Sequence, residues 1–413
     1  AITVICLGVP ALMASENWDD HDRSDRYVAR DFGGNYLASC RPNAIIFSNG
    51  DNDTFPLWYN QEVEGNRTDV RVCNLSYLQT DWYIDQMKRG AYLSQPLPIS
   101  WKQKDYVSGK NEVVWVEDQI KEPLNINTAF DFLLSDDERT KQNGESYMPA
   151  RNLFFPVDAK QAIKTGTVKA EREGEINQRI DITVNRRLTK SELMVLEMLR
   201  TNNWNRPIYF AVTVGDDYYL GLSDHFELTG MAYQIVPTGV KGAGPQVNTE
   251  EMYENMMNKF RYGGVDKPGI YLDENTLRMC RTHRMMFSQL VTALYNEGDS
   301  VRALKALDYC NKVLPAYNIR HDYVSTVLAE YYYKLGQSKK GDEIMDAVAN
   351  DCVKNLEWYF SLGSSKYNSV KNRVSHNLAV LNQVLRICEQ EKQKTVFNKY
   401  MPDYMRYTQS SKL

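Results

Sequence analysis

The sequence predicts an α/β fold in two parts: a small parallel-sheet, Rossmann-like domain with an insertion, and then an all-α, tetratricopeptide-like domain. Short β-branched and aromatic runs alternate with helical patterns in the first half, which is typical of parallel strands joined by helices. A proline-punctuated stretch interrupts this alternation. After Pro245 the apolar spacing is helical to the end. We therefore expect an α/β domain at 17–240, with an irregular insertion at 91–187, and a helical domain at 246–413.

The first fourteen residues are uncharged and mostly apolar. As a helix they would cover ~21 Å, less than the ~30 Å hydrocarbon core of a bilayer. We expect residues 1–16 to be the end of a truncated transmembrane helix, with Trp18 at the membrane interface. A buried N-terminal helix of a soluble protein is the alternative.

The α/β domain is expected to open with a helix that Ser24 caps. Two β-α units follow in under ~50 residues, and such short connections imply parallel strands with right-handed crossovers. The expected strands are 44–48 and 70–75, and the expected helices are 24–39, 55–64 (with Thr54 or Asp53 as N-cap) and 81–89.

Regular patterns return near the end of the insertion. Thr189 and Glu192 form a capping-box pattern that opens a helix to about Asn202. Two further strands are expected at 208–214 and 231–236. Within the insertion we expect a helix at 128–134 and short strand-like runs at 113–116 and 180–184.

The helical domain carries positions of a tetratricopeptide repeat. These are Phe287, Leu290, Gly298, Ala303 and Pro315. A glycine at the turn and an alanine at the crossing allow two helices to pack closely. A second, less regular copy follows. Such a stack would bind a peptide or another domain, or would pack on the α/β domain; the sequence favours neither.

Acidic residues follow the three strands that are expected to be parallel. Because the carboxyl ends of such strands meet at one sheet edge, these acids should converge there. Carboxylates suit a cation or sugar hydroxyls and repel phosphate. The alternative is that each acid only caps a helix or fills a turn. The predicted ligand-binding residues are Asp51, Asn52, Asp53, Trp58, Tyr59, Asp81, Trp82 and Asp216, with Asp51 and Asp53 as metal ligands.

Composition excludes several classes of protein. The net charge is −4 and no basic run interleaves with aromatics, which argues against nucleic-acid binding. Seven scattered cysteines and five histidines without a ligand motif argue against a disulfide scaffold and a zinc site. A divalent cation held by the acidic turn is the one cofactor that the sequence suggests.

Four runs carry a family resemblance. They are N-W-D-D-H-D-R-S from Asn17, P-N-A-I-I-F-S-N-G-D-N-D-T-F-P-L-W-Y from Pro42, Q-E-V-E-G-N-R-T-D-V-R-V-C-N-L-S from Gln61, and T-D-W-Y-I-D-Q-M from Thr80. They resemble the DUF2723 membrane proteins of Bacteroidetes, relatives of animal protein O-mannosyltransferases that modify plexin-type domains. The resemblance covers 17–97. It implies a membrane glycosyltransferase that uses a lipid-linked sugar, with a soluble tail in the periplasm. The catalytic acid of that family lies in the membrane part, so no catalytic residue is carried over to this sequence.

Three functional hypotheses follow. The chain is the extracytoplasmic tail of an O-mannosyltransferase-like protein and binds a glycan, an acceptor protein or its own membrane domain. Alternatively, the D-N-D turn of Asp51 and Asp53 serves a stand-alone, metal-dependent, sugar-handling enzyme. In the third, the chain is a purely structural tetratricopeptide module that binds its own membrane domain.

Overall fold

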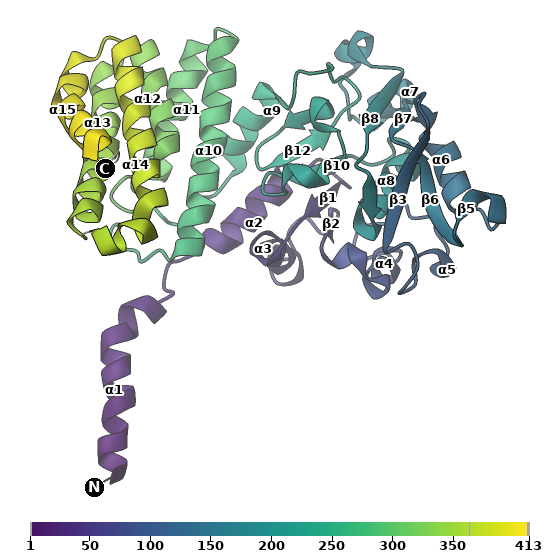
Figure 1. Ribbon diagram of the computed structural model, residues 1–413, viewed down its shortest axis with the longest axis horizontal. Coiled ribbons are helices and arrows are strands. Elements are labelled where there is room, and N and C mark those ends of the chain that lie inside the picture. Colours follow the sequence, from purple (N-terminus) through teal and green to yellow (C-terminus); the bar gives the residue numbers. More distant parts are fainter. Residues whose placement is uncertain (1, 363, 411–413) are drawn as a thin grey trace. The chain divides into compact units, whose positions relative to one another are not determined.

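The computed structural model describes residues 2–362 and 364–410 (Figure 1). They form two compact units: Ala29–Arg261, and Ala1–Val28 together with Tyr262–Leu413. The first unit mixes helices and sheets, and the second is helical, which confirms the predicted α/β and all-α regions. The α/β unit extends to Arg261, beyond the predicted boundary at residue 240.

The main sheet of the α/β unit has six strands in the order β13-β11-β12-β10-β1-β2. Strand β1 pairs in parallel with β2 on one side and β10 on the other, as the sequence predicts. Strand β12 then runs antiparallel to β10 and β11. The strands are β1 (Ile45–Ser48), β2 (Arg71–Asn74), β10 (Ile208–Ala211), β11 (Phe226–Leu228), β12 (Ala232–Ile235) and β13 (Gln246–Val247).

The central strands are buried on both faces. Ile45, Phe47 and Phe210 are all 0% exposed. Near-continuous apolar runs of this kind are expected where helices cover a parallel sheet on both sides. The covering and flanking helices of this unit are α2 (Val28–Ala38), α3 (Asp51–Glu62), α4 (Asp81–Met87), α8 (Lys190–Asn202), α9 (Thr249–Glu254) and a π-helical turn at Asn255–Lys259.

Helix α8 begins as predicted. The Thr189 backbone N–H donates to the Glu192 carboxylate at 2.7 Å, and the Glu192 backbone N–H donates to the Thr189 hydroxyl oxygen at 3.4 Å, which closes the capping box. Helix α3 does not begin as predicted. It starts at Asp51 with Gly50 as N-cap, because Gly50 takes a φ of 79° that turns the chain directly out of β1. Neither Asp53 nor Thr54 is the cap.

Helices α2 and α3 approach closely at Gly33. A Cβ at this position would lie 2.3 Å from the carbonyl oxygen of Pro56, so no larger residue fits there. The Asn60 side-chain amide donates to the Pro56 and Arg30 carbonyls at 2.8 and 2.7 Å, which joins the two helices. Close packing therefore fixes the helix that carries most of the predicted site.

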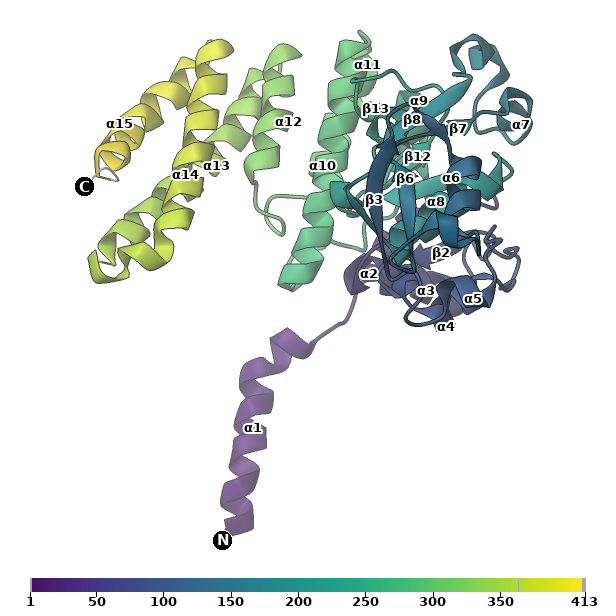
Figure 2. The ribbon, with the colours of Figure 1, turned by 45° about the vertical axis from the view of Figure 1, so that its right-hand side comes forward.

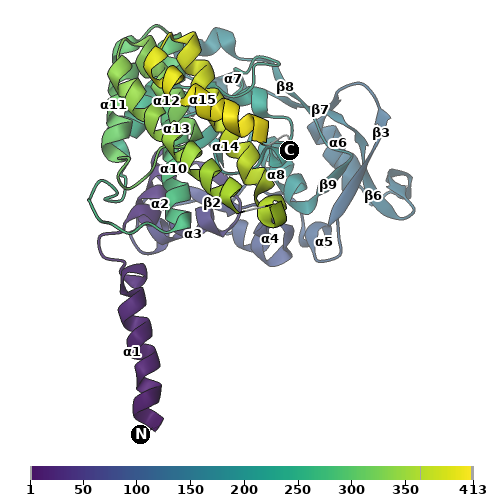
Figure 3. The same cartoon turned by 60° about the vertical axis from the view of Figure 1, so that its left-hand side comes forward.

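The segment 91–187 is more regular than the predicted irregular insertion. The helix expected at 128–134 and the strands expected at 113–116 and 180–184 are present with shifted bounds, and further strands join them. This segment forms most of two further sheets, with strand orders β5-β6-β3-β9 and β4-β7-β8. Figures 2 and 3 show β3 and β6 side by side, and α6 packs against β6. The elements are α5 (Gln103–Tyr106), β3 (Val113–Ile120), β4 (Leu124–Asn125), α6 (Ile126–Leu133), β5 (Lys141–Gln142), β6 (Glu145–Ala150), β7 (Asn152–Pro156), α7 (Ala159–Lys164), β8 (Arg179–Thr183) and β9 (Arg187–Thr189).

Short 3₁₀ turns connect these elements. They are η1 (Tyr77–Gln79), η2 (Glu138–Thr140), η3 (Ala170–Glu175), η4 (Asp216–Tyr218) and η5 (Ser223–His225).

The helical unit consists mainly of successive antiparallel neighbours (Figure 1). Contacts join α10 to α11, α12 to α13, α13 to α14 and α14 to α15. Gly298 and Gly336 take φ values of 83° and 72° in the turns between paired helices. The helices are α1 (Ile2–His21), α10 (Glu274–Asn296), α11 (Ser300–Val313), α12 (Tyr323–Lys334), α13 (Ser338–Ser361), α14 (Ser364–Gln390) and α15 (Lys394–Ser410).

Helix α1 carries the apolar segment that the sequence analysis assigned to a membrane. Its apolar side chains are exposed; Ile2 and Leu12, for example, are 79% and 62% exposed. Within residues 2–362 and 364–410, no helix combines the length and hydropathy that a membrane crossing needs.

Gly341 on α13 gives the first testable prediction. A Cβ at Gly341 would lie 2.3 Å from the ring of Tyr333, which is buried and donates a hydrogen bond to Asp342 at 2.9 Å. Gly341→Ala should lower the free energy of unfolding by about 1–3 kcal/mol, because a packed ring must shift. Urea denaturation followed by circular dichroism measures this. Gly8→Ala on α1, where a Cβ meets nothing within 4 Å, is the matched control and should not destabilise the protein. Equal stability of the two variants would contradict the packing argument.

Candidate functional site

The carboxyl ends of β2, β1 and β10 lie at one edge of the main sheet, because the three strands are parallel neighbours. Ser48 at the end of β1 lies opposite Asn74 at the end of β2. Beyond them, the Ser76 hydroxyl donates to the Asn49 side-chain oxygen at 2.6 Å. We call this edge, with the turns that follow the three strands, the rim.

Buried polar side chains form the floor of the rim. The Thr54 hydroxyl contacts the Ser48 hydroxyl at 2.8 Å and accepts from the Asn74 amide at 2.7 Å. The Asn74 backbone N–H donates to the Tyr83 hydroxyl at 2.9 Å. Each of these side chains is buried, and a satisfied network of this kind holds its members in fixed positions.

Asp53 is the buried acid of the rim. It is 6% exposed and accepts a hydrogen bond from the Thr213 hydroxyl, which follows β10. The Tyr36 hydroxyl lies 2.9 Å from the same Thr213 oxygen. Because Thr213 donates its proton to Asp53, Tyr36 must be the donor to Thr213. A chain of hydrogen bonds therefore runs from Tyr36 through Thr213 to Asp53.

Burial changes the pKa of Asp53 and of Tyr36. It raises the pKa of Asp53 to about 6, although the bond from Thr213 lowers it, and it raises the pKa of Tyr36 well above its ordinary value. Thr213 is exposed, so solvent reaches the middle of the hydrogen-bonded chain. A carboxyl group that titrates near neutrality at a strand end has the properties of a general acid or base.

The other predicted acids have different surroundings. Asp51 and Asn52 lie in the first turn of α3 and are exposed, as is Asp216 in η4. Asp81 accepts backbone bonds from Trp82 at 2.8 Å and from Ser108 at 3.1 Å. Asp81 is the first residue of α4, after the N-cap Thr80, and its bond from Ser108 holds a loop of the insertion. These are local structural bonds, in line with the alternative that such acids only serve turns and helix starts.

The predicted metal site finds no support in this geometry. Among the described residues, no three His, Cys, Asp or Glu side chains are grouped so that they could hold a metal ion. Asp51 and Asp53 differ in exposure, and Asp53 is bonded to Thr213. A divalent cation needs several oxygen ligands together, and two such carboxylates alone do not supply them.

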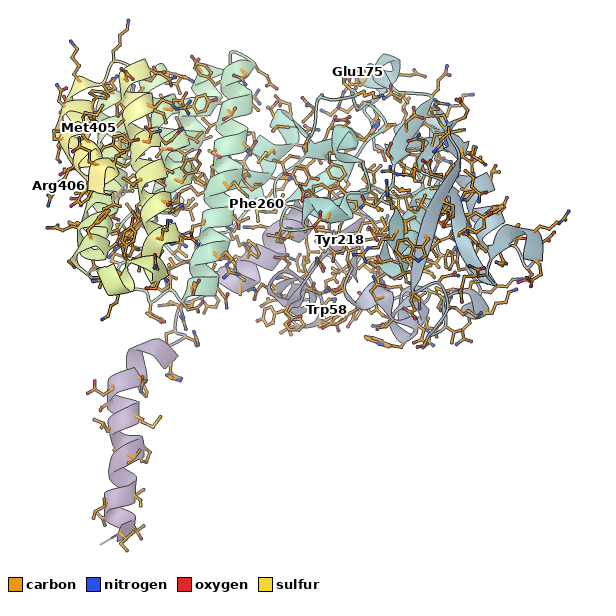
Figure 4. The ribbon with its side chains drawn as sticks, viewed as in Figure 1. Trp58, Glu175, Tyr218, Phe260, Met405 and Arg406 are labelled. Carbon is orange, nitrogen blue, oxygen red and sulfur yellow. The ribbon has the colours of Figure 1, made fainter. Side chains whose placement is uncertain are left out.

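Aromatic rings line up beside the rim, on α3, η1 and α4. The Phe55 and Trp58 centroids lie 5.8 Å apart, and Trp58 stacks on Tyr77 at 6.1 Å with an interplanar angle of 13°. Tyr77 continues to Trp82 at 6.1 Å. Phe55 and Trp82 are 49% and 55% exposed. We call these four residues the aromatic row; Figure 4 shows Trp58 on α3.

The sequence analysis found half of this row. It named Trp58 and Trp82, and also Tyr59, whose hydroxyl donates to Glu64 at 3.0 Å. Phe55 was missed although it lies three residues before Trp58, a spacing that puts two side chains on one helix face. Tyr77 carried no signal, because a 3₁₀ turn has no sequence periodicity to reveal it.

A cavity lies at the opposite edge of the sheet from the rim, where β10 begins. It has a volume of about 190 Å³ and is lined mostly by apolar side chains, among them Ile126, Phe155 and Ile208. Trp204 also lines it and takes an unusual φ of 62°. None of the predicted site residues lines this cavity.

The comparison with protein families decides the affiliation of the α/β unit. The model of TMEM260-associated domain 2 matches residues 29–254, more than half of the chain. The chain belongs to this family. No curated protein and no solved structure matches it.

The TMEM260-associated domain 2 segment coincides closely with the α/β unit. It contains Asp53, Thr213, Tyr36 and the whole aromatic row, and it ends before α10 begins. The rim is therefore part of the family domain, and the helical unit lies outside the matched segment.

Asp53 gives a prediction about stability and pH. Because folding raises its pKa from about 4 to about 6, the folded state binds this proton more tightly than the unfolded state. Burial of Asp53 does not lower the free energy of unfolding below pH 4, where the carboxyl group is protonated in both states. Above pH 6, where it is ionised, burial lowers the free energy of unfolding by up to about 3 kcal/mol. Asp53→Asn removes the ionisation and should be more stable than wild type at pH 7.5 but not at pH 4.

Urea denaturation at the two pH values measures this difference. Asp51→Asn, in the same helical turn but exposed, is the control and should show no such gain. An Asp53→Asn variant less stable than wild type at pH 7.5 would show that the ionised carboxylate is needed by the fold.

Proposed function

We propose that this chain is the extracytoplasmic tail of a membrane-attached, O-mannosyltransferase-like protein, and that its α/β domain binds a glycan through the aromatic row. The row is the observation that carries this proposal. The family name, which associates the domain with TMEM260, and the DUF2723 resemblance at 17–97 support the membrane context. In this proposal the tail lies in the periplasm, and its partners are glycan, acceptor protein and the membrane domain of the same protein.

The chemistry of the row suits a sugar. Sugar rings present C–H faces that stack on aromatic rings, while their hydroxyls need polar partners alongside. Exposed Asn52 and Asp51 lie on the same helix as Phe55 and Trp58. Because the rings of the row contact one another, little side-chain freedom is lost when a ligand stacks on them.

Two features of the fold extend the proposal. Strands β2, β1 and β10 with helices α3 and α4 support a Rossmann-like half-domain, whose ligands bind beyond the strand ends. The paired helices α10–α11 and α12–α13, with glycines at both turns, support a tetratricopeptide-like stack. Such a stack would hold the acceptor protein or the membrane domain.

Asp53 favours a second candidate, a stand-alone sugar-handling enzyme. A carboxyl group with a pKa of about 6 beneath an exposed Thr213 is suited to proton transfer. Hydrolysis or transfer of a model glycoside by the purified chain, lost in Asp53→Asn with folding unchanged, would favour this candidate over binding alone.

Trp82 provides the test of the glycan proposal. Binding of the purified chain to a glycan array, followed by calorimetry with the best glycan, should give a saturable affinity. Trp82→Ala should weaken it about tenfold, or ~1.4 kcal/mol, because one stacking face is lost. Its melting temperature should not change, since Trp82 is 55% exposed.

Trp115→Ala is the matched control. Trp115 is a 59% exposed tryptophan on β3, outside the row, and its loss should leave glycan affinity unchanged. A wild-type chain that binds no glycan, or equal affinities of the Trp82→Ala and wild-type chains, would refute glycan binding by the row.

A further inference from the structure

A pocket of about 220 Å³ lies beside β2, the edge strand of the main sheet. Residues of α3, of β2 and of the segment after α4 line it. Trp58 forms part of its lining, whereas Tyr77 and Trp82 do not line it. The pocket is thus a separate site from the aromatic row, although the two share one side chain.

Arg71 is the unusual residue of this pocket. It is 5% exposed, and its Nη2 donates to the carbonyls of Gln86 and Arg89 at 3.0 and 3.1 Å. Its Nε and Nη1 are buried and have no hydrogen-bond acceptor. Arg71 also forms no ion pair with any described residue. Burial lowers its pKa, as expected of a cation without a counter-charge.

The surrounding charges do not compensate Arg71. Burial, followed by the charge of nearby Arg71, lowers the pKa of Arg206 to about 10, so Arg206 is a second cation rather than a counter-charge. The nearby Asp69 is held by Arg67 at 2.9 Å. Exposed Arg89 adds a second positive charge to the lining.

Glu62 is the one acid among the described residues that line the pocket, and it accepts a hydrogen bond from Tyr92. The lining therefore holds two arginines and one carboxylate, which leaves an excess of positive charge.

A structural role explains only part of this arrangement. Nη2 of Arg71 caps the carboxyl end of α4, where cations and donors are favoured. The other two donors gain nothing from that cap. A buried donor without a partner is unfavourable and rare in folded proteins, so two on one charged group call for another acceptor.

We propose that this pocket binds a small ligand through a carboxylate or phosphate group, with Arg71 as its charge partner. Nε and Nη1 lie on different edges of the guanidinium, so each offers the oxyanion a single charge-assisted hydrogen bond from a planar cation. Nε and Nη1 lie beneath the pocket surface, so binding includes a change in the outer torsions of the Arg71 side chain. Arg89 adds attraction at the entrance, and Trp58 offers a flat wall to the rest of the ligand.

Calorimetry and thermal unfolding of the full chain test the proposal, at constant ionic strength set with sodium chloride. The probes are glucuronate and inorganic phosphate, with glucose as the neutral match of glucuronate. At least one anion should bind saturably and raise the melting temperature, while glucose should not. Tighter binding of glucuronate would indicate a carboxylate ligand, and tighter binding of phosphate would indicate a phosphate ligand.

Variants then assign the binding to this pocket. Arg71→Met keeps the side-chain length without the charge, and should lower anion affinity about tenfold or more. Arg187→Met removes an exposed arginine outside the pocket and should have no effect. Trp82→Ala should bind the anion as tightly as wild type, because Trp82 does not line this pocket. Loss of glycan binding and loss of anion binding can therefore be told apart.

Two results would overturn the proposal. One is that neither anion binds saturably up to tens of millimolar. The other is that Arg71→Met binds as tightly as wild type. If Arg71→Met does not fold, Arg89→Glu replaces it, because its exposed side chain tolerates substitution. Reversing that charge should weaken anion binding, and an unchanged affinity would equally refute the site.

Discussion

The α/β unit depends on the parallel pairing of β1 with β2 and β10. Strand β1 begins at Ile45 and its partner in β10 at Ile208, so the pairing closes a long loop that includes the two sheets of the insertion. Once the strands are in register, their carboxyl ends must lie together. Contacts such as that between Thr213 after β10 and Asp53 after β1 exist only because of this pairing.

The same register separates two buried charges. Arg71 opens β2, and Asp53 follows the end of β1. Three residues of strand span about 10 Å, so the guanidinium at one end of the sheet and the carboxyl at the other are too distant to form an ion pair. Among the described residues neither group forms an ion pair, and burial raises the pKa of Asp53 and lowers that of Arg71. The fold retains two groups that burial alone disfavours.

Local signals in the sequence predicted much of the fold, and long-range contacts account for what they missed. The capping box of Thr189 and Glu192 and the turn at Gly298 depend on neighbouring residues, and both are present. In the insertion, the strand-like runs at 113–116 and 180–184 could be identified from sequence, but the pairings that join them to distant strands in two sheets leave no local signal. Asp51 and Asp53 look alike in sequence, because the burial of Asp53 and its hydrogen bond from Thr213, far along the chain, arise only in the folded protein. In the sequence, Arg71 is an ordinary residue of a predicted strand. Only the structure shows that two of its hydrogen-bond donors have no acceptor.

These buried charges bear on how stability and binding are linked. A ligand that binds only the folded state stabilises it according to its concentration relative to the dissociation constant. An oxyanion that pairs with Arg71 would also remove the cost of its two unpaired donors, so the ligand-free unit is the less stable state. Asp53 also lowers the stability of the folded state above pH 6, because burial disfavours its ionised form. A protein selected for stability alone would replace both groups, because an apolar residue of similar volume is often neutral or stabilising at such a position. Both groups are nevertheless present, Arg71 at the amino end and Asp53 beyond the carboxyl end of the parallel strands, which favours binding, rather than folding, as the reason that they are buried.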